Sequence, residues 1–142
     1  MNSAAKLFCD YLEQRNVKYN TPRSDVVSVG YAGDNCSSIR LNFIFGEDGR
    51  DVSIISNGIA KIQAEDHSKL LKALMGCSAL NQHYRWIKFY VDKDNEVVAQ
   101  DDAVIEPHTT GEECYELLQR SVDIIDKAYP IIMQTVWGTG SK

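Results

Sequence analysis

The histidines and the acidic residues beside them are the first side chains in this sequence that could do chemistry. His67, His83 and His108 have no partner at metal-ligand spacing, because the chain contains neither HExxH nor Cys-x-x-Cys. Glu65 and Asp66 precede His67, but acidic residues are also favoured where a helix begins. We therefore predict no metal site and no cofactor.

A second candidate is an acidic turn that imitates the start of a calcium-binding loop. It contains Asp92, Asp94 and Glu96 in alternate positions. An EF-hand also needs a glycine at position six, a glutamate at position twelve and a helix on each side. Val97 and Ala103 occupy those two positions, so we interpret the segment as a solvated hairpin turn.

Cys114 is the candidate nucleophile, because it falls in the first turn of a predicted helix, where the dipole can lower the pKa of a thiol. Glu112 and Glu113 oppose that effect. Cys114 also lies on the apolar stripe of the helix, which favours a buried and inert thiol. A hydrolase or redox enzyme built on Cys114 or His108 is the least favoured hypothesis, and we predict that the protein is not an enzyme.

Composition excludes several classes of partner. The chain has 142 residues, the size of one domain, and its 20 acidic and 15 basic residues give a net charge of −5. That charge argues against binding to nucleic acid, which requires a basic surface. Cys9, Cys36, Cys77 and Cys114 are widely spaced, as expected of reduced thiols. No apolar run could cross a membrane or serve as a signal peptide, so we predict a cytoplasmic protein.

The first half of the chain predicts one helix and three strands. The helix covers residues 3–16, a loop covers 20–22, and the strands cover 25–32, 38–46 and 51–56. Gly49 is expected at a positive φ in the turn between the last two strands, and Asn57-Gly58 should end or bulge the third. The strongest alternation in the chain is that of Ile39, Leu41, Phe43 and Phe45.

A second helix is predicted over residues 67–82, with Asp66 or Ser68 as its N-cap. Gly76 in its middle suggests a close approach to the sheet. Its apolar stripe is predicted to consist of Leu70, Leu71, Leu74, Met75 and Leu80.

A β-hairpin over residues 84–105 and a long last helix complete the chain. Thr110 and Glu113 fit a capping box at the start of that helix, and Pro130 should kink or break it. The order is α-β-β-β-α-β-β-α, which predicts an α+β fold with an antiparallel sheet and helices packed on one face. We expect a single domain over residues 1–137 and a flexible tail over 138–142.

Three stretches of the chain carry a family resemblance. They are residues 74–85 with Ala79-Leu80-Asn81, residues 89–98 of the hairpin, and residues 126–132 with Tyr129-Pro130. Together they resemble the YbjN family, which has a type III secretion chaperone-like fold. The resemblance implies a bacterial regulator of sensory transduction, related to secretion chaperones that act as homodimers and bind segments of other proteins. It implies no catalytic residue.

The second face of the predicted sheet is the candidate site. If Ile39 and its alternating neighbours face the helices, then Arg40, Asn42, Ile44, Ser53 and Ile55 face away from them. In the hairpin we place Trp86, Lys88 and Tyr90 on that same outer side, with Val98 and Gln100 beside them. The predicted partner-binding residues are therefore Ile44, Ile55, Trp86, Tyr90 and Val98.

Two alternatives remain open for this face. The same residues could be isolated apolar side chains of an ordinary surface, and a register slip of one residue would exchange the two faces. We predict a non-enzymatic, cytoplasmic protein-binding module, a chaperone-like adaptor or regulator that acts as a homodimer on a protein partner of unknown identity. The alternative is a small-molecule-binding sensor with a pocket between sheet and helices.

Overall fold

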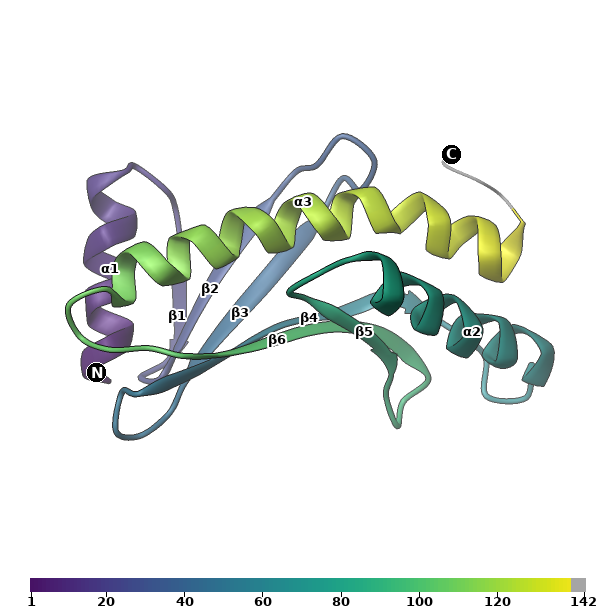
Figure 1. Ribbon diagram of the computed structural model, residues 1–142, viewed down its shortest axis with the longest axis horizontal. Helices are drawn as coiled ribbons and strands as arrows, with labels where there is room; N and C mark the ends of the chain where they lie inside the picture. Colours follow the sequence, from purple (N-terminus) through teal and green to yellow (C-terminus); the bar gives the residue numbers. More distant parts are fainter. Residues whose placement is uncertain (139–142) are drawn as a thin grey trace.

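The computed structural model describes residues 1–138 and contains three helices and one six-stranded sheet (Figure 1). The helices are α1 (Ser3–Gln14), α2 (His67–His83) and α3 (Thr110–Trp137). The strands are β1 (Asn20–Arg23), β2 (Val26–Tyr31), β3 (Ile39–Phe45), β4 (Asp51–Lys61), β5 (Lys88–Val91) and β6 (Glu96–Val104). Their order in the sheet is β1-β2-β3-β4-β6-β5, and all neighbours are antiparallel.

The predicted fold class is confirmed, with one strand added. Residues 20–23 form β1 at the edge of the sheet, where the sequence predicted a loop at Pro22. An edge strand tolerates a proline because one side of the strand needs no N–H donor. Residues 139–142 of the predicted tail lie outside the described residues.

The core lies between one face of the sheet and the helices α1 and α3. The ring of Phe8 in α1 is 4.6 Å from that of Phe43 and 6.2 Å from that of Phe45, measured between centroids. The predicted alternation of β3 and β4 is confirmed, because six core-facing side chains are buried: Ile39, Leu41, Phe43, Phe45, Val52 and Ile54.

The turns follow the sequence closely. Gly49 has a φ of 71°, and Gly58 has a φ of 65° at an irregularity in the pairing of β4 with β6, so β4 is bulged and continues to Lys61. The acidic segment between β5 and β6 is a hairpin turn, in which the carboxylate of Asp92 accepts hydrogen bonds from the N–H groups of Asp94 (2.9 Å) and Glu96 (3.0 Å).

The helix ends are partly as predicted. Asp66 caps α2, accepting a hydrogen bond of 3.1 Å from the N–H of Lys69. The predicted capping box is wrong, because α3 begins at Thr110, one residue earlier than that motif requires. The Thr110 hydroxyl instead donates to the carbonyl of Glu106 (2.7 Å). A break at Pro130 is also wrong, since α3 is continuous through it.

Helix α2 turns a different face inward from the one predicted. Its buried side chains are Ala73, Cys77 and Leu80, of which only Leu80 belongs to the predicted stripe. A Cβ atom on Gly76 would lie 3.1 Å from Cγ2 of Thr135, so this glycine allows close approach to α3 and not to the sheet. Three large apolar side chains of the predicted stripe are exposed instead: Leu71 (58%), Leu74 (54%) and Met75 (64%).

The outer edge of β5 is covered by one side chain of α2. The amide of Asn81 donates to the carbonyl of Phe89 (2.9 Å) and accepts from the N–H of Phe89 (2.7 Å). These are the two bonds that a neighbouring strand would otherwise make. Asn81 therefore satisfies the edge and closes it to another chain.

The loop between β2 and β3 is held by a carboxylate of α3. Asp126 accepts hydrogen bonds from the N–H groups of Asp34 (3.1 Å), Asn35 (2.8 Å) and Cys36 (2.8 Å). Gly33 makes this approach possible, because a Cβ atom there would lie 2.2 Å from the carboxylate. Burial alone would raise the pKa of Asp126, but the three backbone bonds outweigh it and lower the pKa below its usual value.

Replacing Asn81 tests the edge contact. Asn81→Ala leaves the N–H and carbonyl of Phe89 without these partners, so we expect the free energy of unfolding to fall by about 1–2 kcal/mol. Urea unfolding measures this value. Gln82→Ala, a change at the exposed neighbouring position, should shift it by less than about 0.5 kcal/mol. Equal stability of the two variants would contradict the role of Asn81.

Asp126 should make stability depend on pH. Because folding lowers the pKa of Asp126, its ionised form stabilises the fold above the unfolded pKa, and this contribution is lost as pH falls through the folded pKa. We expect Asp126→Asn to lose about 1 kcal/mol at pH near 7, a modest value because the group is partly exposed to solvent. Urea unfolding should show this gap shrinking at pH below about 4. A gap that persists in acid would refute the linkage, and Asp123→Asn, in an exposed pair with Lys127, is the control.

Candidate protein-binding surface

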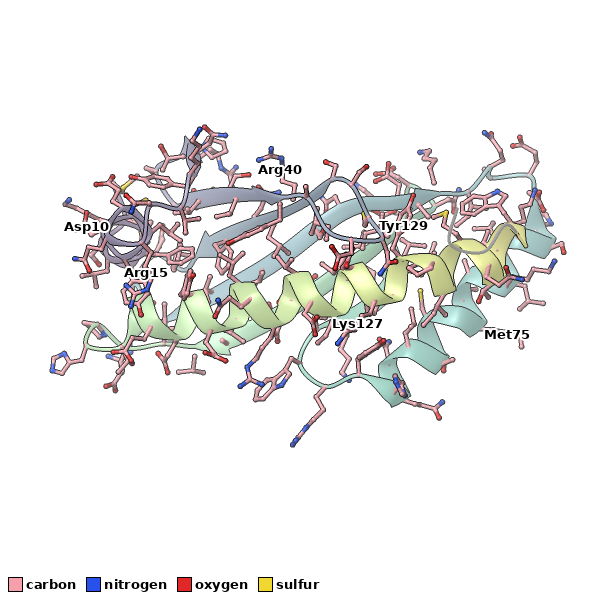
Figure 2. All side chains as sticks on the ribbon, turned by 90° about the horizontal axis from the view of Figure 1, so that it is seen from above. Asp10, Arg15, Arg40, Met75, Lys127 and Tyr129 are labelled. Atoms are coloured by element: carbon pink, nitrogen blue, oxygen red, sulfur yellow. The ribbon has the colours of Figure 1, made fainter. Side chains whose placement is uncertain are left out.

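The sheet face opposite α3, called the outer face below, is not covered by any helix of the described chain. Figure 2 shows Arg40 projecting on this side of the sheet while α3 lies on the other. The residues that the alternation assigned to it are half-buried or exposed: Arg40, Asn42, Ile44, Ser53 and Ile55. The predicted register of β3 and β4 is therefore confirmed.

Hydrogen bonds between side chains cross the outer face from β4 to β5. The Ser53 hydroxyl donates to Asp102 (2.5 Å), and the amide of Gln100 donates to the same carboxylate (3.3 Å). The Tyr90 hydroxyl donates to the carbonyl oxygen of Gln100 (2.7 Å). This half of the outer face is thus a connected polar network.

Three of the five predicted partner-binding residues lie on this face and are accessible. Ile44 pairs with Ser53, and Ile55 pairs with Asn42, so the two isoleucines are diagonal neighbours on β3 and β4. Tyr90 is 40% exposed on β5. The partner-binding role of these residues stays a prediction.

Val98 is on the outer face but is not accessible. It pairs with Tyr90, and it is only 2% exposed. The strand that carries it, β6, has neighbours on both sides at this level. The expectation that Val98 offers an exposed contact is therefore wrong, and its side chain supports the face from within.

Trp86 lies on the opposite side from Tyr90, which corrects the predicted face. It precedes β5 and has a φ of 75°, which interrupts the alternation of the strand. Its indole, 47% exposed, lines a groove with Val104 of β6 and Leu117 of α3. The guanidinium of Arg120 in α3 lies 5.2 Å from the ring centroid. Periodicity alone carries no signal for a positive φ at a bulky residue.

The side chains considered for catalysis and metal binding are dispersed. Cys114 is fully buried, and burial, with a smaller effect of Glu113, raises the pKa of its thiol to about 12. Burial raises the pKa of Cys77 to about 11. Within residues 1–138, no three His, Cys, Asp or Glu side chains are placed to hold a metal ion. In the same range, no helix is both long and apolar enough to span a membrane.

Three solved structures resemble this one and confirm a type III secretion chaperone-like fold. YbjN from E. coli has a TM-score of 0.60 and 11% identity, over 87% of this chain and 90% of that one. A chain of the ExsC–ExsE complex has a TM-score of 0.54 and 13% identity, over 93% and 97%. A chain of the ExoU–SpcU complex, from the type III secretion system of Pseudomonas aeruginosa, has 0.54 and 12%, over 92% and 98%.

The family comparison is more specific than these likenesses, which at such identities show the fold alone. No curated protein matches the chain significantly. Residues 5–132, however, match the YbjN family, described as "Putative bacterial sensory transduction regulator". That match spans α1 through most of α3 and includes all six strands. The chain therefore belongs to the YbjN family.

Proposed function

We propose that this chain is a non-enzymatic, chaperone-like adaptor or regulator, which binds other proteins as a homodimer in the cytoplasm. One observation carries the proposal: α2 exposes Leu71, Leu74 and Met75, here called the α2 stripe. Their exposed fractions of 58%, 54% and 64% are high for large apolar side chains on adjacent turns of one helix. Figure 2 shows Met75 projecting outward from α2.

A second copy of the chain is the occupant that fits the α2 stripe best. Side chains at i, i+3 and i+4 form one continuous row, and two such rows can pack face to face about a twofold axis. In an antiparallel pair of α2 helices centred on Leu74 and Met75, Leu71 of one copy would contact Ser78 of the other. Neither residue is charged, so this contact does not place like charges against each other. Burying each leucine or methionine fully contributes about 1.5–3 kcal/mol.

The comparisons support a protein partner in addition to this dimer. ExsC was solved with ExsE, and SpcU with ExoU, and both complexes contain a chain of this fold. The family description of a sensory transduction regulator fits an adaptor that acts by binding. The four cysteines are all free, as expected in a reducing compartment.

We place the partner contact of the outer face at Ile44, Ile55 and Tyr90. The two isoleucines are half-buried diagonal neighbours, and Tyr90 presents a ring with a polar tip. Aromatic residues with a hydroxyl or indole N–H are enriched at protein interfaces. Val98 contributes by supporting Tyr90, its cross-strand neighbour.

A small-molecule sensor is the second candidate, although its best hollow lies beside Arg40 on the outer face and not between sheet and helices as the sequence predicted. This hollow is lined by cations without acids. Lys18 and Arg40 line it with Ser28, Ser37 and Ser38. Arg40 donates to the hydroxyl of Ser28 (3.0 Å) and takes part in no ion pair within residues 1–138. In a chain of net charge −5, this hollow favours a small anion.

Light scattering tests the homodimer. The chain of 16.0 kDa should have a mass of about 32 kDa, twice 16.0, at micromolar concentration. Leu71→Glu with Met75→Glu should return it to a monomer, because a charged α2 stripe cannot be buried against itself. Gln63→Glu with Ala64→Glu adds the same charge at exposed positions just before α2 and should leave the dimer intact. A natural chain that is monomeric at about 100 µM would refute the dimer.

A second double variant tests the outer face. Ile44→Ser with Tyr90→Ser should reduce the protein captured from a lysate of the native host at least several-fold, because it removes the apolar anchors. Thermal unfolding should confirm that the variant folds, with a stability loss of about 1–2 kcal/mol from the half-buried isoleucine and the bond to Gln100. The same captured proteins in the same amounts would contradict a role for this face.

A further inference from the structure

The end of β6 next to α3 has an unpaired strand edge. On one side, β4 pairs with β6 as far as Val104. On the other side, β5 pairs only with residues 97–100. Figure 1 shows β6 continuing past β5 toward the end of the molecule where α3 begins. Residues 101–104 therefore have a neighbouring strand on one side only.

The register identifies the backbone groups on this open side. Phe89 directs its N–H and carbonyl at Asn81, away from β6, so the opposite residue Ala99 directs its own toward β4. The direction alternates along a strand, which turns the N–H and carbonyl of Asp102 and Val104 toward the open side. The N–H of Ile105 donates to the carbonyl of Arg50 on the β4 side (3.0 Å), as this alternation requires.

A groove with an apolar floor lies beside the open edge, and we call it the Trp86 groove. Trp86, Ala103 and Leu117 provide apolar side chains on the α3 side, and Val104 also borders the groove, although its pairing with Asp51 places its side chain on the other face of β6. Val104 is 85% exposed, more than any other large apolar side chain among residues 1–138, and Trp86 is 47% exposed. Apolar side chains exposed beside an unpaired strand edge are what a bound β-strand would cover.

The charged residues of the groove come mainly from one face of α3 and are mostly acidic. They are Glu112, Glu113, Glu116 and Arg120. Arg120 pairs with Glu116 at 2.9 Å, and Glu113 accepts a hydrogen bond of 2.8 Å from the Thr109 hydroxyl. Glu112 takes part in no ion pair within residues 1–138.

Two further charged groups border the groove. Arg85 lies over the ring of Trp86, 5.9 Å from its centroid, next to Arg120 at 5.2 Å. Asp101 is on the same face of β6 as Ala103, and one of its carboxylate oxygens is buried without a hydrogen-bond partner in the described chain. The three glutamates of α3 therefore leave negative charge that the two arginines do not neutralise.

From the open edge and this charge, we propose that the Trp86 groove binds an extended, basic segment of a partner protein as an added strand of the sheet. Its backbone pairs with Asp102 and Val104. Side chains that it directs toward α3 are alternately apolar, against Trp86 and Leu117, and lysine or arginine, against Glu112. The inference rests on the proposed protein-binding function, but on neither the homodimer nor the outer face.

Trp86 supports this assignment through its backbone. A φ of 75° suits glycine and disfavours a bulky side chain, so a tryptophan here lowers the stability of the fold. The indole is half-exposed and contributes little to the core. A residue that lowers the stability of the fold and adds little to the core is expected at a position that contacts a partner.

Titration with two synthetic hexapeptides, followed by amide NMR, tests the groove. The basic peptide is Val-Ser-Lys-Ser-Val-Ser, which as a strand directs valine and lysine alternately to one face, and the acidic peptide has glutamate in place of that lysine. The basic peptide should shift the amides of Asp102 and Val104 and the indole N–H of Trp86, and should slow hydrogen exchange at the two amides. The acidic peptide should bind about tenfold more weakly or not at all.

Three variants separate the parts of the site. Val104→Pro removes an open-edge N–H that β4 does not use, and should weaken the basic peptide about tenfold. Trp86→Gly should weaken it as well while leaving the fold at least as stable, because glycine accepts the positive φ. Glu112→Lys should weaken it about fivefold, whereas Glu65→Lys, the same charge change at an exposed position far along the chain, should not.

The outcomes distinguish this site from the wider proposal. Absence of saturable binding at millimolar basic peptide, or equal binding of the acidic peptide, overturns the groove. Changes in amide chemical shift that are confined to β1 or to the outer face also overturn the groove proposal, although they would leave a protein-binding function intact. If Val104→Pro does not fold, unchanged affinity in the folded Trp86→Gly variant is sufficient to refute the proposal.

Discussion

The burial of a single sheet face under α3 is the constraint on which the rest of the structure depends. Helix α3 covers the sheet with one row of side chains, including Leu118, Ile125 and Ile132. Two glycines let the other helices reach its ends: a Cβ atom on Gly111 would lie 2.6 Å from the ring of Tyr11 in α1, and Gly76 of α2 meets Thr135. Since α1 and α2 pack at opposite ends of α3, the outer face of the sheet stays open.

An open six-stranded sheet has two edge strands, and in this chain each is protected from pairing with another molecule in a different way. Asn81 closes β5, and the short β1 contains Pro22, which has no N–H to offer. Charged side chains, prolines and covering groups are common ways to prevent strands of different molecules from pairing. The end of β6 has two acidic residues but no covering group, so an incoming strand must first be compatible with that charge. In the proposal above, the glutamates of α3 beside this edge favour a basic strand.

Much of the fold could be predicted from local pattern, because alternation in β3 and a cap at Asp66 are properties of adjacent residues. The buried face of α2 could not be predicted in this way. Which face a helix buries depends on how closely each face can approach its neighbour, and α2 packs against α3 with the face that contains Ala73 and Cys77. Trp86 was assigned to the wrong side because one positive φ interrupts a strand pattern without changing its composition. The contact of Asp126 with residues 34–36 joins segments about 90 positions apart, beyond any local signal.

The features that lower stability are concentrated on the proposed binding surfaces. The α2 stripe leaves three large apolar side chains exposed, and Trp86 has an unfavourable φ. One carboxylate oxygen of Asp101 is buried without a hydrogen-bond partner in the described chain. Desolvation raises the pKa of Asp101, so its ionised form is disfavoured in the folded chain. Polar substitutions in the α2 stripe and at Asp101, and a glycine at position 86, would remove these features. These features lie beside well-satisfied contacts at Asn81 and Asp126, and a bound partner would offset their cost to stability.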